Sequence, residues 1–141
     1  MPRVFLDTSV LFSAIYSRTG GSYQICQLVR QGKVEGFTSQ TVVKELTSNV
    51  SKFNKKTKIS AENFIADIKL IVRTEITAKE IKSYLKITAA KDAHVLAGAV
   101  LCKCDYLLSL DKKHLDNTGV KNNFTQALIT SPKEFLEYFR R

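Results

Sequence analysis

The sequence predicts an α/β fold with a mainly parallel central sheet of about four to five strands, flanked by helices on both faces. Short apolar segments of strand length alternate along the chain with longer segments in which apolar residues recur at helical spacing. Residues 4–6 form a short apolar run that stops at a polar residue, as expected of a buried parallel strand. No repeat, linker or low-complexity segment interrupts this order, so we expect one domain over residues 1–141.

Five segments are expected to form the strands of this sheet. They lie at residues 4–6, 36–38, 71–74, 106–110 and 127–129. The first ends directly on Asp7 and the fourth directly on Asp111. These two aspartates therefore mark the ends of two predicted strands.

The segments between the strands carry helical apolar spacing and, in most cases, a side chain that can cap a helix. Helices are expected at residues 8–17, from Ser22 to Gly32, after Ser39, after Ser60, after a Thr77–Glu80 capping box, at about residues 90–103, and after Ser131, with Pro132 at the first helical position. In the helix after Ser60, the inward residues are expected to be Phe64, Ile65, Ile68 and Ile71. Residues 52–58 contain four lysines and no apolar period, so we expect a loop there.

The composition is that of a globular protein with a surplus of positive charge. Hydrophobic residues make up 44% of the chain and charged residues 25%. Twenty-two Lys and Arg residues against 13 Asp and Glu residues give a net charge of +9. This surplus favours contact with polyanions such as nucleic acid, although a generally basic surface without such a partner fits the same count.

The cysteines and the N-terminus indicate a cytoplasmic protein. Cys26, Cys102 and Cys104 are an odd number without disulfide or zinc-site spacing, so we expect small buried side chains in a reducing compartment. The apolar run before Asp7 is too short for a signal peptide, and no apolar stretch approaches transmembrane length.

Four carboxylates are candidates for one site at an edge of the sheet. In an open parallel sheet, ligands bind outside the carboxyl ends of the strands. Asp7 and Asp111 follow two strands, and Asp92 lies in the first turn of a helix that should start at the same edge. Glu45 lies in the middle of a helix and can point across the cleft.

Each of these residues also has a structural explanation. Asp7 can cap the following helix, Asp92 can favour the positive end of its helix, and Asp111 can start a turn. Glu45 alone would be a residue of a solvated helix face. Together, however, four converging carboxylates repel each other unless a cation binds, and such oxygen ligands suit Mg²⁺ or Mn²⁺. A metal at such a site can generate hydroxide while basic residues hold a phosphate backbone.

Four segments resemble, in order, the motifs of PIN domains. Val-Phe-Leu-Asp-Thr-Ser at residues 4–9 is similar to the opening strand of that family, and Val-Val-Lys-Glu-Leu at 42–46 to its glutamate helix. Lys-Asp-Ala-His-Val-Leu-Ala-Gly-Ala at 91–99 resembles its Asp-Ala-x-x-Leu-Ala-x-Ala helix. Cys-Asp-Tyr-Leu-Leu-Ser-Leu-Asp at 104–111 resembles its last catalytic strand, with Ser109 where Thr or Ser usually stands. The resemblance spans nearly the whole chain.

The resemblance implies a metal-dependent nuclease that hydrolyses RNA, often the toxin of a VapC-type toxin–antitoxin pair. Carried over to this chain, it makes Asp7, Glu45, Asp92 and Asp111 the catalytic metal ligands, directly or through water, with Mg²⁺ or Mn²⁺ as the cofactor. It makes Ser9 and Ser109 supporting hydroxyls and gives Asp105 a structural role. A homodimer and a cognate antitoxin that covers the site are implied as partners.

Several basic residues outside these motifs are weaker candidates. Lys52, Lys55, Lys56 and Lys58 are predicted to contact nucleic acid as a clamp beside the cleft, but a solvated loop fits equally well. Lys79, Lys82 and Lys86 could track phosphates, although a solvated helix face is the simpler interpretation. His94 is expected to serve packing, because a metal-bound water needs no histidine as a base.

Two other functions remain open from the sequence. The first is a PIN-fold nucleic-acid-binding module with little or no catalytic activity, which would bind RNA without turnover. The second is a phosphoacceptor domain, which usually has paired acids after the first strand, where this chain has Asp7 alone. The residues do not choose between RNA and DNA, or between one metal ion and two.

Overall fold

Five parallel strands form the central sheet, in the order β3–β2–β1–β4–β5. They are β1 (Arg3–Leu6), β2 (Glu35–Ser39), β3 (Ile71–Arg73), β4 (Tyr106–Leu108) and β5 (Leu128–Thr130). The computed structural model describes residues 1–53 and 60–140 of the chain. The predicted α/β fold and its parallel sheet are confirmed.

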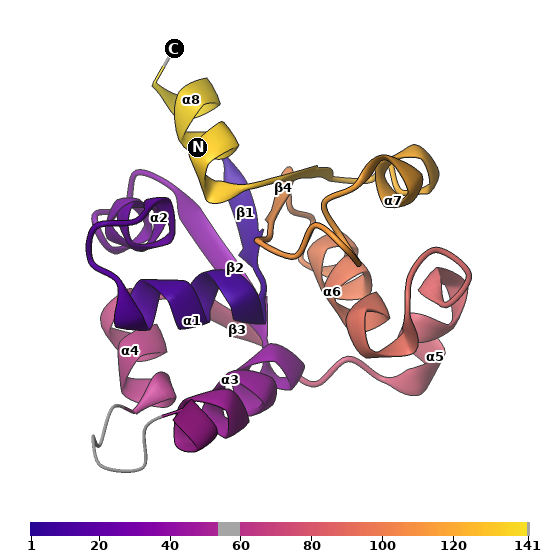
Figure 1. Cartoon of the computed structure of the whole chain (residues 1–141), viewed down its shortest axis with the longest axis horizontal. Coiled ribbons are helices and arrows are strands. Elements are labelled where there is room, and N and C mark those ends of the chain that lie inside the picture. The colour runs from indigo at the N-terminus through magenta and orange to yellow at the C-terminus, as the bar shows by residue number, and fades with distance from the viewer. Residues whose placement is uncertain (54–59, 141) are drawn as a thin grey trace.

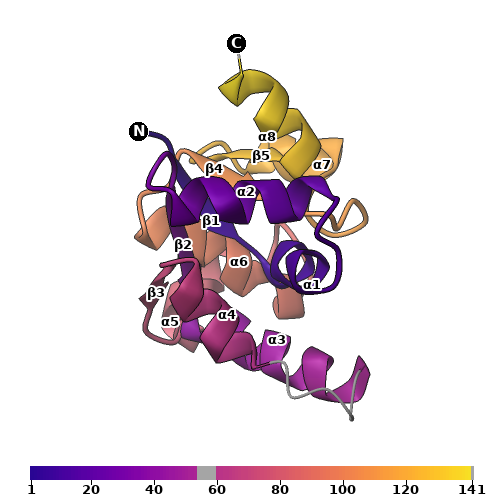
Figure 2. The same ribbon diagram turned by 90° about the vertical axis from the view of Figure 1, so that its left-hand side faces the viewer.

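Helices cover both faces of this sheet (Figure 1). On one side lie α1 (Thr8–Tyr16) and α2 (Gly21–Arg30), and on the other lies α6 (Ala90–Leu101). The C-terminal helix α8 (Pro132–Phe139) packs against α2 (Figure 2). The other helical segments are α3 (Gln40–Phe53), α4 (Ala61–Asp67), α5 (Ala78–Ile81), the 3-10 helix η1 (Lys82–Tyr84) and α7 (Thr118–Asn123). Within the described ranges, no helix is long and apolar enough to cross a membrane.

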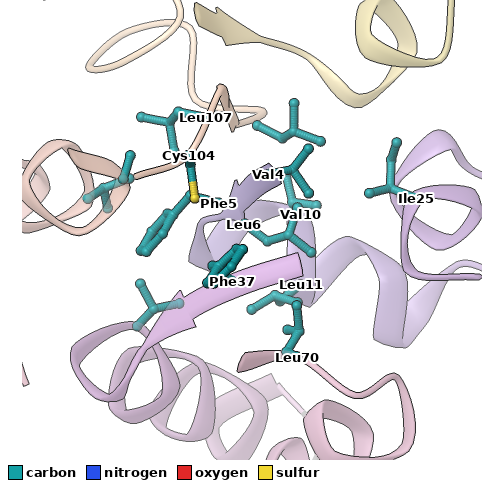
Figure 3. Packing of buried hydrophobic residues seen from close by; sticks show 14 of the residues in the cluster. Val4, Phe5, Leu6, Val10, Leu11, Ile25, Phe37, Leu70, Cys104 and Leu107 are labelled. Carbon is teal, nitrogen blue, oxygen red and sulfur yellow. The ribbon is translucent and has the colours of Figure 1, made fainter. Parts of the chain in front are cut away.

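The central strand β1 is buried in the core (Figure 3). Val4, Phe5 and Leu6 are fully buried between the two helical layers. Helix α6 approaches this strand closely at Gly98, where an added Cβ would lie 2.6 Å from Cζ of Phe5. The packing therefore fixes the strand that immediately precedes Asp7.

Most of the expected helix caps are present. The Ser39 hydroxyl accepts a hydrogen bond from Val42 N at 3.2 Å, and the Ser60 hydroxyl accepts one from Asn63 N at 3.1 Å. Thr77 and Glu80 form the predicted capping box, and Ser131 caps α8 with Pro132 at its first position. Local side-chain chemistry thus sets where these four helices begin.

Two expectations in the first half of the chain are wrong. Ser22 does not cap the second helix: α2 begins at Gly21 after Gly20, and Ser22 is buried inside it. The start of this helix packs against α8, where Gly21 lies close to Pro132, so tertiary contact and not a cap sets it. Ile71 does not point inward from a helix either. It is half-exposed in β3, at the edge of the sheet.

Other details of the secondary structure also differ from the expectation. Of the loop predicted at residues 52–58, Lys52 and Phe53 belong to α3, and the remaining residues lie outside the described part of the chain. Strand β4 ends at Leu108 and not at Asp111, since the chain turns away from the sheet there. Helix α7 was not predicted, because residues 118–123 show no apolar period, and Val120 is its one buried residue.

The strand order also bears on the phosphoacceptor alternative. Receiver-type domains have the doubly wound order 2-1-3-4-5. The order here is 3-2-1-4-5, so the first strand is flanked by the second and fourth. This topology argues against a phosphoacceptor domain.

Candidate metal site at the carboxyl edge of the sheet

The ends of β1 and β4 meet at one edge of the sheet, as the sequence predicted. Leu6 pairs with Leu108 in the parallel register, so Asp7 and the turn after Leu108 lie side by side. A pocket of about 500 Å³ opens at this edge. All four predicted carboxylates line it, and the other lining residues are Thr8, Ser9, Phe12, Ser13, Asn49, Lys91, Val95, Leu110 and Leu115.

Asp7 is the most deeply buried of the four carboxylates, with 3% of its surface exposed. Its Oδ1 accepts hydrogen bonds from Ser9 Oγ at 2.6 Å and from Val10 N at 3.0 Å. The second bond makes Asp7 the cap of α1, so its structural and chemical roles coexist. Burial raises the pKa of Asp7 from 3.8 to about 6, although the hydrogen bonds from Ser109, Ser9 and Val10 oppose this rise.

The two predicted supporting hydroxyls connect the Asp7 carboxylate to the backbone of the turn that carries Asp111. Ser109 Oγ donates to Asp7 Oδ2 at 2.5 Å and accepts from Asp111 N at 3.0 Å. Ser9 Oγ, which donates to Asp7, accepts from Leu110 N at 3.0 Å. Both serines therefore join the N-terminal end of α1 to the turn after β4.

Asp92 and Asp111 face each other across His114, which was not predicted from the sequence as a site residue. His114 Nδ1 lies 3.1 Å from Asp111 Oδ2 and 3.8 Å from Asp92 Oδ2. One donor atom from each of the three side chains falls within 4.8 Å of the others. Partial burial raises the pKa of Asp92, and the negative charges of Asp111 and Glu45 add to this rise while His114 opposes it.

Glu45 reaches the pocket from α3 and is held by two side chains. Thr8 Oγ1 donates a hydrogen bond to Glu45 Oε1 at 3.1 Å. His94 Nε2 lies 3.0 Å from the same oxygen. The geometry is not that of a hydrogen bond, and Nε2 has no hydrogen-bond partner among the described residues. The His94 ring is buried, which agrees with the predicted packing role, and it also faces Glu45.

This donor set suits a divalent cation. Asp92 Oδ2 is a buried carboxylate oxygen that has no hydrogen-bond partner among the described residues. An unpaired buried oxygen is costly unless a cation or a bound water satisfies it. Asp92, Asp111 and His114 bring donor atoms within 4.8 Å of one another, whereas Asp7 and Glu45 line the same pocket outside this group.

The other acidic and basic candidates lie elsewhere or outside the described residues. Asp105 has the structural role that was predicted, since its Oδ2 accepts a hydrogen bond from Arg3 N at 2.9 Å. Lys52 is exposed near the end of α3, and Lys55, Lys56 and Lys58 fall within residues 54–59, which the structure does not describe.

Lys91, Asn49 and His114 were missed as site residues. Asn49 follows Glu45 by one helical turn, and Lys91 directly precedes Asp92, so both spacings could have found them. His114 follows Asp111 by three residues, which is turn spacing that sequence alone does not distinguish from an ordinary loop.

Comparison with known proteins agrees with this geometry. The PIN domain family model matches residues 3–113. The chain belongs to the PIN-domain family. Members of this family are generally nucleases, and the acidic cluster of this chain is a possible metal site. Among curated proteins, no sequence matches the chain.

Several solved structures share the PIN fold. The chain is similar to VapBC2 of Rickettsia felis bound to promoter DNA, with 17% identity, a TM-score of 0.60, and coverage of 92% of this chain and 98% of that one. It is also similar to the sarcin–ricin-loop-cleaving toxin VapC20 of Mycobacterium tuberculosis, with 13% identity, a TM-score of 0.51, and coverage of 88% and 98%. FitAB bound to DNA matches at 13% identity and a TM-score of 0.54, with coverage of 92% and 94%. At these identities the likeness establishes the fold.

Proposed function

We propose that this PIN domain is an endoribonuclease that hydrolyses RNA phosphodiester bonds with Mg²⁺ or Mn²⁺. The observation that carries the proposal is the convergence of four carboxylates on one pocket of a protein whose net charge is +9. Among the described residues, one buried oxygen of this cluster, Asp92 Oδ2, has no hydrogen-bond partner. A divalent cation would offset the repulsion and satisfy this oxygen.

Asp7, Glu45, Asp92 and Asp111 would hold the ion, directly or through water. When bound, the metal would supply a hydroxide nucleophile and polarise the scissile phosphate. Ser9 and Ser109 orient Asp7 through its two oxygens, and Thr8 orients Glu45. These hydrogen bonds fix the carboxylates before a ligand arrives, which lowers the cost of ordering them on binding.

The substrate contact is expected to be made by Lys91, which lines the same pocket. Its ammonium can attract a phosphate that flanks the scissile bond. Binding by Lys52, Lys55, Lys56 and Lys58 stays a prediction. The choice of RNA over DNA follows the family, since none of these contacts reads a 2′-hydroxyl.

The biological role we propose is that of a toxin in a type II toxin–antitoxin pair, acting in the cytoplasm as a homodimer. The support is the similarity in fold to VapBC2, to VapC20 and to FitAB. The expected partner is an antitoxin that covers the carboxylate pocket. Expression of the wild-type chain should then arrest growth, whereas Asp92→Asn should not.

A cleavage assay tests the enzymatic proposal. A pool of single-stranded RNAs and, separately, a pool of DNAs of the same sequences are incubated with the wild type or with Asp92→Asn. Each reaction contains Mg²⁺, Mn²⁺ or EDTA. Asp67→Asn, which alters an exposed carboxylate at the end of α4, serves as the matched control. We expect metal-dependent cutting of RNA by the wild type and by Asp67→Asn, with a loss of at least about 100-fold in Asp92→Asn.

Three other results would change the proposal. Cutting of DNA at an equal rate would leave a nuclease but remove the RNA assignment. RNA binding without turnover under any metal would favour the binding module that the sequence left open. Cutting that survives in Asp92→Asn would remove the carboxylate pocket from the mechanism.

A further inference from the structure

His114 lies beside two of the pocket's carboxylates, Asp92 and Asp111, and differs from them in chemistry. Its Nδ1 faces both Asp92 and Asp111, at 3.8 Å and 3.1 Å from their Oδ2 atoms. The side chain is 28% exposed, so the ring is accessible to a small ligand.

The backbone fixes this ring beside the two aspartates. Asp111 Oδ1 accepts a hydrogen bond from His114 N at 3.0 Å. The carbonyl of His114 accepts one from Thr88 Oγ1 at 2.6 Å, and the next residue, Leu115, is buried in the core. The turn is therefore anchored on both sides of His114, and the position of the ring does not depend on a flexible side chain alone.

A simple hydrogen bond does not account for the whole arrangement. A protonated Nδ1 can donate to Asp111 Oδ2 at 3.1 Å, but this leaves Asp92 Oδ2 buried and, among the described residues, without a hydrogen-bond partner. A cation between the three side chains would contact all of them. Donor atoms that share one metal at bonds of about 2.1 Å lie about 3 to 4 Å apart, and the three atoms here already lie within 4.8 Å of one another.

We infer that His114 is a direct metal ligand and makes this a mixed nitrogen and oxygen site that binds Mn²⁺ more tightly than Mg²⁺. The inference rests on the proposed metal-dependent function and specifies its cofactor. Mg²⁺ prefers oxygen ligands and holds its waters strongly. Mn²⁺ shares the preference for oxygen but, as a first-row transition metal, also accepts an imidazole nitrogen. In the bound state the proton of the His114 ring sits on Nε2, which leaves Nδ1 free to coordinate.

Metal binding without substrate tests this inference. The Mn²⁺ dissociation constant is measured from the EPR signal of free Mn²⁺, and the Mg²⁺ constant by competition, for the wild type, His114→Ala and Lys113→Ala. Lys113 is the exposed neighbour of His114 and serves as the matched control. Pulsed EPR of the Mn²⁺-loaded proteins then reports whether a ¹⁴N nucleus couples to the ion.

We expect the wild type and Lys113→Ala to bind Mn²⁺ at least about tenfold more tightly than Mg²⁺ and to show ¹⁴N coupling. His114→Ala should lose the coupling and weaken Mn²⁺ binding about tenfold or more, with a smaller change for Mg²⁺. A thermal unfolding midpoint close to that of the wild type would show that His114→Ala still folds.

The results that would overturn the role of His114 differ from the result that would overturn the proposed function. Mn²⁺ binding of equal strength in the wild type and His114→Ala, without ¹⁴N coupling in either, would overturn the ligand role of His114 and leave the carboxylate site standing. Coupling that persists in His114→Ala would assign the nitrogen to another residue and overturn the inference in the same way. A wild type that binds neither ion would overturn the metal site, and the proposed function with it.

Discussion

Ser109 Oγ donates a hydrogen bond of 2.5 Å to Asp7 Oδ2, which ties the turn after β4 to the end of β1. Ser109 Oγ also accepts a hydrogen bond from Asp111 N at 3.0 Å. One buried hydroxyl thus positions two of the four carboxylates. Replacing Ser109 with an apolar residue would leave Asp7 Oδ2 and Asp111 N without this hydrogen-bond partner, so we expect the site to be sensitive to that substitution.

We expect Ser109→Ala to weaken activity and to shift its pH dependence. The hydrogen bond from Ser109 lowers the pKa of Asp7, so its loss should raise that pKa further and move the acidic limb of the cleavage profile to higher pH. Cleavage at pH 7 should fall about tenfold or more, and the free energy of unfolding should fall by about 1 to 2 kcal/mol.

Ser109→Thr is the control for this change, since it keeps the hydroxyl. It should retain the pH profile of the wild type even if the added methyl group costs some stability at this fully buried position. An unchanged profile in Ser109→Ala would mean that the hydroxyl does not tune Asp7.

The raised pKa of Asp7 predicts how the stability of the metal-free protein depends on pH. The folded pKa is about 6 against an ordinary value of 3.8, so the folded state takes up a proton more readily than the unfolded state. The stabilisation from the protonated form is complete below about pH 4 and is lost as the pH rises through 6. The loss is of the order of 3 kcal/mol, from a shift of roughly two pKa units.

Asp7→Asn should remove this dependence. In EDTA, urea unfolding at a series of pH values should show that the free energy of unfolding of the variant rises relative to that of the wild type between about pH 4 and 7. Divalent metal should stabilise the wild type more than the variant and reverse the order, because the variant lacks one of the proposed ligands and binds the ion more weakly. Cleavage should be lost in the variant while the fold is retained. Parallel stability curves for the two proteins would contradict the assigned pKa.

The placement of Asp7 and Asp111 could be predicted because parallel strands bring their carboxyl ends to one edge of a sheet. The prediction placed Asp111 at the correct edge of the sheet, although the strand before it was predicted to be two residues too long. Strand β4 ends at Leu108, and the hydroxyls of Ser9 and Ser109, not the strand itself, hold the turn that carries Asp111.

The contribution of His114 could not be predicted in the same way. Its place depends on a turn closed by Thr88, which lies 26 residues earlier in the sequence. Periodicity and capping signals describe neighbours along the chain, and neither describes a contact between two loops. Ile71 failed for a related reason, since its half-exposed position follows from the edge location of β3 and not from its apolar side chain.

Gly98→Ala should destabilise the fold despite the higher helix propensity of alanine. An added Cβ would lie 2.6 Å and 2.8 Å from two ring atoms of Phe5, which is fully buried in β1. Overpacking of this kind costs about 1 to 3 kcal/mol, whereas Gly to Ala in an open helix position gains up to about 1 kcal/mol. Urea unfolding should show the loss, and a Phe5→Leu background should recover part of it.

Gly119→Ala is the matched control for Gly98→Ala. Gly119 lies in the exposed helix α7, where an added Cβ would come no closer than 3.4 Å to Asn117 Oδ1. Its effect on the free energy of unfolding should stay within about 0.5 kcal/mol. Equal effects at the two glycines would contradict the close packing of α6 on β1.

Lys91→Ala should separate substrate binding from metal binding. Lys91 lines the carboxylate pocket, where its charge can hold a phosphate. We expect KM for RNA to rise several-fold and the salt dependence of binding to weaken by about one phosphate contact, with the Mn²⁺ dissociation constant nearly unchanged. Lys33→Ala, an exposed lysine in the turn before β2, should behave like the wild type. If both variants lose the same affinity for RNA, the general positive charge and not Lys91 binds the substrate.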